Sequence, residues 1–139
     1  MARCKVRPIT VNGEAWRVVR ASPGDPLLID RTGVPRLATC DPSTRTIRVS
    51  ADVTPPLLDR VLLHEVAHAV TMSHGLLDAL HGALPEDLWI PVEEWAVQLV
   101  ENFSMEAVAL ASESLGRPLC IRGLCSDRLG DNRPGDQRA

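Results

Sequence analysis

Residues 57–74, with the sequence LLDRVLLHEVAHAVTMSH, constrain the fold more than any other part of the chain. Apolar residues recur there at three- and four-residue spacing, which is the period of an amphipathic helix. Thr54 precedes the segment as a candidate N-cap, and Pro55 and Pro56 stand at or near the first helical position. The sequence therefore predicts a helix over about residues 55–72.

The predicted helix contains an H-E-x-x-H pattern, His64 to His68. Histidines four residues apart lie on one face of a helix, so both imidazoles can bind one metal ion, and Glu65 leans toward the same site. The alternative interpretation is a buried helix with two structural histidines. The histidine pair together with Glu65 favours a catalytic Zn²⁺ site, in which Glu65 acts as the general base.

The third zinc ligand is ambiguous, because a catalytic zinc usually has three protein ligands. His74 has the spacing of the third histidine in H-E-x-x-H-x-x-G-x-x-H, but Thr71 stands where that pattern has its glycine. Glu93 and Glu94 are the other candidates, although acids near the start of a helix are also common on a solvated face. The residues alone leave all three candidates open.

Two hairpins are predicted before the H-E-x-x-H helix. Asn12-Gly13 between two β-rich runs favours a type I′ turn. A polar segment, residues 41–45, separates two further β-rich runs and predicts a second hairpin. The four predicted strands are residues 6–11, 15–19, 37–40 and 46–50.

After the H-E-x-x-H helix, Gly75 is placed to end it, and residues 76–88 form a mixed segment. Pro91 can begin a second long helix, about residues 91–115, and Gly116 closes it. These elements predict an α+β fold. A small antiparallel-rich sheet of three to four strands is expected to pack on the H-E-x-x-H helix and the second long helix.

A chain of 139 residues suits one domain, predicted here as residues 1–125. Residues 126–139 are polar and rich in Gly, Asp and Arg, so we expect a flexible tail. The net charge of -3 gives no general attraction to nucleic acid or to anionic membranes. No apolar run suits a membrane span and no signal-peptide pattern opens the sequence, so we expect a cytoplasmic protein without membrane or nucleic-acid partners.

The four cysteines are too scattered for a C-x-x-C zinc cluster, and without an export signal free thiols are expected. The alternative is that Cys120 and Cys125 form a redox-active disulfide or contact the metal. The cysteines are Cys4, Cys40, Cys120 and Cys125.

Three segments carry a resemblance to a known family: HEVAH, the run VEEWAVQLVENF at residues 92–103, and the strands ATCD and TIRVS before the first helix. Together they span about residues 36–105 and resemble the ImmA/IrrE-like metallopeptidases, in particular the short stand-alone versions of phages and prophages. The resemblance implies a gluzincin, in which a glutamate of the second helix is the third zinc ligand. An Asp or Asn four residues after that glutamate can orient a ligand histidine.

Glu94 with Gln98 fits this four-residue relation, whereas Glu93 would be paired with Val97, which cannot accept a hydrogen bond. The resemblance therefore implies zinc bound by His64, His68 and Glu94. Gln98 stands in place of an acidic residue. Its amide would raise the basicity of a ligand histidine less than a carboxylate would.

The implied activity is hydrolysis of peptide bonds in a protein or peptide substrate, and by analogy the substrate is a regulatory protein. The chain has no tyrosine, so His74, His81, an arginine or the metal alone must stabilise charge on the substrate carbonyl. The alternatives are a catalytically weak or inactive zinc-binding interaction module, and an adaptor with a vestigial motif. Glu65 favours the enzyme, because a structural zinc site needs no general base.

Overall fold

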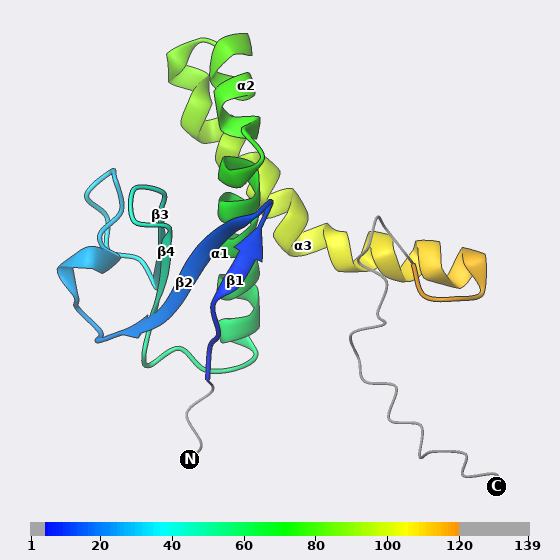
Figure 1. Ribbon diagram of the computed structural model, residues 1–139, viewed down its shortest axis with the longest axis horizontal. Helices are drawn as coiled ribbons and strands as arrows, with labels where there is room; N and C mark the ends of the chain where they lie inside the picture. The colour runs from blue at the N-terminus through cyan, green and yellow to red at the C-terminus, as the bar shows by residue number, and fades with distance from the viewer. Residues whose placement is uncertain (1–4, 120–139) are drawn as a thin grey trace, which may run out of the picture. The chain divides into compact units, whose positions relative to one another are not determined.

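The computed structural model describes residues 5–119 and has an α+β fold, as the sequence predicts (Figure 1). A mixed sheet of four strands is combined with three α-helices. Two short 3-10 helices, Pro26–Leu28 and Glu86–Leu88, lie in the connections. The elements are β1 (Ile9–Val11), β2 (Glu14–Ala21), β3 (Ala38–Asp41), β4 (Thr46–Ser50), α1 (Leu57–Ser73), α2 (Leu76–Ala83) and α3 (Trp89–Leu115).

The chain divides into two compact units, residues 1–102 and 103–139. The first unit contains the sheet, α1, α2 and the part of α3 up to Asn102. The predicted domain end at residue 125, the polar tail 126–139 and the cysteines Cys4, Cys120 and Cys125 lie outside the described residues. None of the helices over residues 5–119 has both the length and the apolar character to cross a membrane.

The first hairpin turns at Asn12 and Gly13, as predicted. Both residues have positive φ, 48° and 77°, as a type I′ turn requires. The turn sets the register in which Val11 pairs with Glu14. The prediction that the first strand starts at residue 6 is wrong, because β1 starts at Ile9, directly after Pro8. Proline has no N–H group to donate to the strand ladder.

The sheet has the order β1-β2-β4-β3, which places β1 and β3 at its edges. The β1–β2 and β3–β4 pairs are antiparallel, and β3 and β4 form the second predicted hairpin. The central β2–β4 pair is parallel. The parallel pairing requires a long connection between the two hairpins, and residues 22–37 provide it.

The core lies between one face of the sheet and α1. Trp16, Ile47 and Val49 from the strands are fully buried, and Ala69 of α1 packs in the same cluster. The indole Nε1 of Trp16 donates a hydrogen bond of 2.8 Å to Ser73 Oγ. This buried bond joins β2 to the last turn of α1.

The helix boundaries follow the prediction with two exceptions. The predicted capping by Thr54 is wrong: Pro56 occupies the N-cap position without a side-chain capping bond, and Thr54 accepts only through its main-chain oxygen. Gly75, at φ 68°, ends α1 as predicted. The mixed segment after Gly75 is more regular than expected, because it forms α2 and a 3-10 helix.

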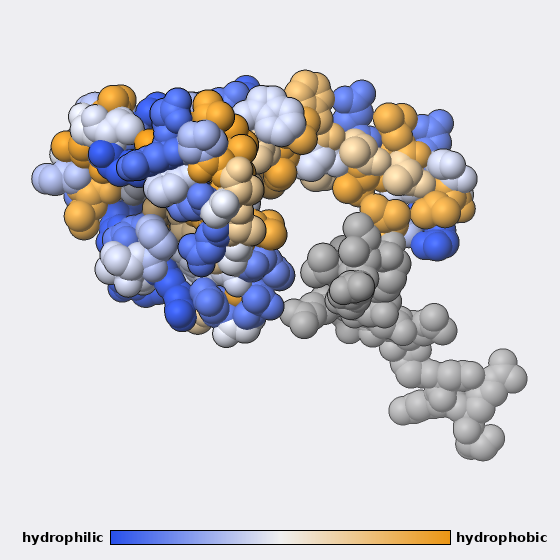
Figure 2. Space-filling model, turned by 90° about the horizontal axis from the view of Figure 1, so that it is seen from above, coloured by the Kyte–Doolittle hydropathy of each residue, from blue (hydrophilic) through white to orange (hydrophobic). Residues whose placement is uncertain are grey.

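Within the first unit, α3 presents its acidic side to the protein interior. Glu93 and Val97 are its buried residues, whereas Trp95 is 64% exposed and Leu99 is 46% exposed. Figure 2 shows that apolar side chains reach the protein surface among hydrophilic ones. An apolar-inward helix is the usual arrangement, so specific polar contacts must hold this acidic face inside.

We expect Ser73→Ala to lower the free energy of unfolding by about 1–3 kcal/mol, because the buried Trp16 Nε1–H then has no acceptor. Chemical denaturation monitored by circular dichroism measures the change. Ser22→Ala is the control, since Ser22 is exposed and its side chain makes no described hydrogen bond. In a Trp16→Phe background, Ser73→Ala should lower the free energy of unfolding by less than it does in the wild type. An equal loss in both backgrounds contradicts a stabilising role of the Trp16–Ser73 hydrogen bond.

Candidate metal centre

The two histidines of the H-E-x-x-H pattern converge on one point beside α1. Their Nε2 atoms lie 3.3 Å apart. The ring centroids are 5.0 Å apart and the ring planes are inclined by 67°. His68 is buried and His64 is half-buried. Two nitrogens on successive helical turns therefore point into the same small space.

Glu94 of α3 completes the cluster. Its Oε1 lies 3.4 Å from His68 Nε2 and its Oε2 lies 3.6 Å from His64 Nε2. One ligand atom from each of the three side chains lies within 4.8 Å of the others. Zinc–nitrogen and zinc–oxygen bonds of about 2.0–2.2 Å in tetrahedral geometry separate two ligand atoms by roughly 3.3–3.6 Å. The donor types and their spacing therefore fit a zinc ion.

Glu93 takes a different position from Glu94. Its Oε1 lies 3.1 Å from Nδ1 of His68, on the far side of the ring from Glu94, and its Oε2 accepts a 2.9 Å bond from Arg31 Nη2. Burial raises the pKa of Glu93, but the hydrogen bonds from His68 and Arg31 outweigh this effect and lower it to about 2. The ionised carboxylate can only accept, so His68 Nδ1 is the donor.

Glu101 has the same relation to His64. Its Oε2 lies 3.0 Å from His64 Nδ1, and its Oε1 accepts a 3.0 Å bond from Arg60 Nη2. Sequence alone does not point to this contact, because Glu101 and His64 lie 37 residues apart in the chain. Gln98, the partner expected from the family resemblance, is exposed, and its described hydrogen bond is made by its main-chain oxygen.

The distribution of charge around the cluster suits a cation. With a carboxylate at each Nδ1 atom, both Nε2 atoms are left to present lone pairs toward each other and toward Glu94. Burial lowers the pKa of His68, but hydrogen bonds with Glu93 and Glu94 outweigh burial and raise it to about 9. Either a proton or a divalent metal ion can satisfy such a group of acceptors. The donor set of two imidazoles and a carboxylate is one that zinc prefers.

Glu65 lies on the same helix between the two histidines and is 8% exposed. Burial raises the pKa of its carboxyl, and the charges of His68 and His64 partly oppose that effect. A carboxyl with a raised pKa is a stronger base than an ordinary one. Cys40 is a free thiol whose pKa burial and the charge of Glu65 raise to about 12. A protonated thiol is a poor metal ligand.

The structure places the remaining histidines away from the cluster. His74 is exposed at the C-cap of α1, and His81 stacks on Trp89 with ring centroids 4.1 Å apart. Neither histidine belongs to the His64–His68–Glu94 group. Of the three candidates for the third ligand, Glu94 is therefore the one that the structure brings to both Nε2 atoms.

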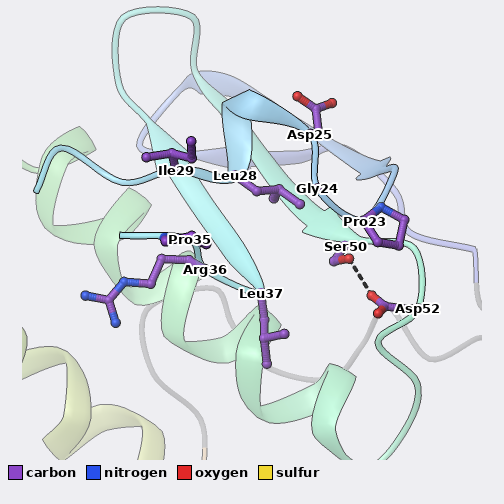
Figure 3. Close-up of a pocket in the computed structure, with 10 residues that line it drawn as sticks. All are labelled: Pro23, Gly24, Asp25, Leu28, Ile29, Pro35, Arg36, Leu37, Ser50 and Asp52. Atoms are coloured by element: carbon purple, nitrogen blue, oxygen red, sulfur yellow. Dashed lines mark hydrogen bonds between the residues drawn. The ribbon is translucent and has the colours of Figure 1, made fainter. Parts of the chain in front are cut away.

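A hollow of about 260 Å³ lies elsewhere, beside the connection between β2 and β3 (Figure 3). Ser50 and Asp52 contribute to its lining, and neither histidine of the cluster does. Arg36 also borders it, but the Arg36 guanidinium points away from Ser50 and Asp52. The His64–His68–Glu94 group is thus separate from this hollow.

Comparison of the chain with models of known protein families, with curated proteins and with solved structures finds no match. The resemblance to ImmA/IrrE-like metallopeptidases therefore stays a prediction. A functional assignment has to rest on the chemistry of the site itself.

We expect Glu94→Ala to weaken zinc binding by more than roughly 10–100-fold. That range is typical for loss of a residue that only forms a hydrogen bond with a metal ligand. The reason is that Glu94 supplies one of the three convergent donors. Competition with a chromophoric chelator measures the affinity of the full chain. His74→Ala is the matched control, and a larger loss with His74→Ala than with Glu94→Ala contradicts the ligand set.

Proposed function

We propose that the protein is a zinc-dependent peptidase that hydrolyses a peptide bond in a protein or peptide substrate. The observation that carries the proposal is the convergence of His64, His68 and Glu94, with the buried Glu65 between the two histidines. The coordinating side chains would be those three. When bound, zinc would supply a Lewis acid that polarises a carbonyl and makes water acidic enough to lose a proton near neutral pH.

Glu65 would transfer the proton in this reaction. Its carboxylate would accept a proton from the water that attacks the carbonyl carbon and would then donate it to the departing amine nitrogen. The raised pKa of Glu65, caused by burial, suits a group that must both take and release a proton. A site that only stabilised the fold would gain nothing from a buried carboxyl at this position.

Arg36 is the side chain we assign to the substrate carbonyl oxygen, because the chain has no tyrosine for this role. The guanidiniums of Arg31 and Arg60 are bound to Glu93 and Glu101. Arg36 donates through Nε to Asp30 and is 54% exposed. Its hydrogen bond with Asp30 raises its pKa, and the nearby charges of Glu94 and Glu65 add to that effect. A cation close to both carboxylates is suited to developing negative charge.

The sheet offers a way to hold an extended substrate. β3 is an edge strand and packs on α1, the helix that carries Glu65. Extended peptides commonly add to an edge strand through main-chain hydrogen bonds. This arrangement supports a peptide rather than a small metabolite as the substrate.

We expect Glu65→Gln to lower peptide hydrolysis by at least about 100-fold, because the general base is lost. Zinc content and the unfolding midpoint should stay near wild type, since Glu65 is not among the three donors. Hydrolysis is measured by mass spectrometry on a denatured protein mixture and a peptide library. The matched control is Glu86→Gln, because Glu86 is exposed and lies outside the cluster.

The two classes of function give different results in this assay. If the wild type binds one zinc ion per chain but hydrolyses no peptide, the result contradicts the peptidase and supports a zinc-binding interaction module. Hydrolysis that Glu65→Gln does not change would contradict the mechanism. Removal of zinc with a chelator should abolish hydrolysis, and added zinc should restore it.

We expect Arg36→Ala to lower kcat by about 100–1000-fold, the range seen when a donor to a developing oxyanion is removed, with little change in zinc affinity. Steady-state kinetics on a peptide found by the library screen measures the effect. Arg36→Lys should retain part of the rate because it keeps the charge. Arg7→Ala, an exposed arginine outside the site, is the control. A rate loss equal for both alanine variants contradicts the assignment.

A further inference from the structure

Two ion pairs lie behind the histidines: Arg31 with Glu93, and Arg60 with Glu101. We propose that Glu101, held by Arg60, is a positioning residue that keeps His64 in the Nδ1–H tautomer with Nε2 turned toward the metal. Glu93 has the same relation to His68. The inference rests on the proposed metal site and adds to it the residues that set its affinity.

The geometry of Glu101 supports this role. One carboxylate joins two groups: Oε2 lies 3.0 Å from His64 Nδ1 and Oε1 lies 3.0 Å from Arg60 Nη2. Arg60 Nη2 also donates to Asn102 Oδ1 at 3.3 Å. A guanidinium that holds two consecutive side chains of α3 restricts the rotation of the Glu101 carboxylate. The side chain of Glu101 is 14% exposed, so water competes weakly for its oxygens.

The tautomer of His64 decides whether it can bind a metal. A neutral imidazole has one nitrogen that donates and one that accepts. Nε2 can bind a cation only when the ring proton is on Nδ1, and a carboxylate at Nδ1 favours that form. His64 is 23% exposed at its side chain, whereas His68 is 9% exposed. His64 therefore has less packing than His68 to fix its ring and depends more on its hydrogen bond.

The direction in which α3 passes α1 brings Glu101 to His64. Glu93 of α3 contacts His68, while Glu101, eight residues later, contacts His64, one turn earlier in α1. The two helices therefore run in opposite directions where they meet. Glu101 follows Glu94 by seven residues, close to two helical turns, so both side chains leave α3 on nearly the same side. Gln98 is exposed and does not face either ring through a described contact.

The affinity of the full chain for zinc tests the proposal. Glu101→Ala should weaken zinc binding by about 10–100-fold. Glu101→Gln should weaken it less, because an amide oxygen still accepts from Nδ1–H but carries no charge. Arg60→Ala should also have a smaller effect, since Arg60 is 63% exposed and exposed ion pairs contribute little. Gln98→Ala and Glu106→Ala are the controls and should bind zinc as the wild type does.

Nuclear magnetic resonance of the full chain with ¹⁵N-labelled histidine separates positioning from a general loss of stability. The wild type should show an Nδ1–H signal for His64 and another for His68, with and without added zinc. Glu101→Ala should lose the His64 signal and keep the His68 signal, and Glu93→Ala should do the reverse. Glu101→Gln should recover the His64 signal. A merely structural role would change both rings or neither.

Two results overturn the proposal: an unchanged His64 signal and zinc affinity in Glu101→Ala, or a loss in Gln98→Ala as large as that in Glu101→Ala. A wild type that binds no zinc would defeat the proposed function instead. In that case the Nδ1–H signal of His64 still tests the role of Glu101. Loss of this signal in Glu101→Ala supports the role, and an unchanged signal contradicts it.

Discussion

Hydrogen bonds between carboxylates and imidazoles hold α3 against α1, and the polar architecture of the first unit depends on them. A buried carboxylate such as Glu93 is costly to remove from water unless charged partners compensate it. His68 and Arg31 supply those partners from α1 and from the connection between β2 and β3. The same contacts that make burial of Glu93 tolerable also hold the His68 ring in the orientation that the proposed metal site needs. Packing and the proposed chemistry therefore depend on the same hydrogen bonds.

These polar contacts explain why the acidic side of α3, rather than its apolar side, faces the interior. An ordinary surface helix would bury Trp95 and Leu99 and expose its acids. Here Glu93 and Glu101 are largely covered because His68 and His64 pair with them, and the large apolar side chains remain exposed. Departures from the usual hydrophobic pattern tend to occur at functional sites, where polar chemistry outweighs apolar burial. The exposure of Trp95 thus follows from the polar contacts made by the opposite side of α3.

Local rules predicted the local parts of the structure. The hairpin at Asn12-Gly13 was predictable because the φ angles of a type I′ turn depend on these two residues alone. The approach of His64 to His68 was predictable because residues four apart share one face of a helix. The parallel pairing of β2 with β4, the contact of Arg31 with Glu93 and that of Glu101 with His64 join residues far apart in sequence. No local pattern encodes such pairings, which is why the sequence left Glu93, Glu94 and His74 open as ligands.

Glu93 and Glu94 are neighbours of the same chemical type, yet they contact different atoms of His68. In this protein the 100° turn between consecutive helical residues sends one carboxylate to Nδ1 of His68 and the other to Nε2. Loss of the first would free a ring to rotate, and loss of the second would remove a donor. An insertion or deletion of one residue ahead of Glu93 would shift both by that angle. α3 therefore tolerates changes of side chain along its outer surface far better than any change in its length before this pair.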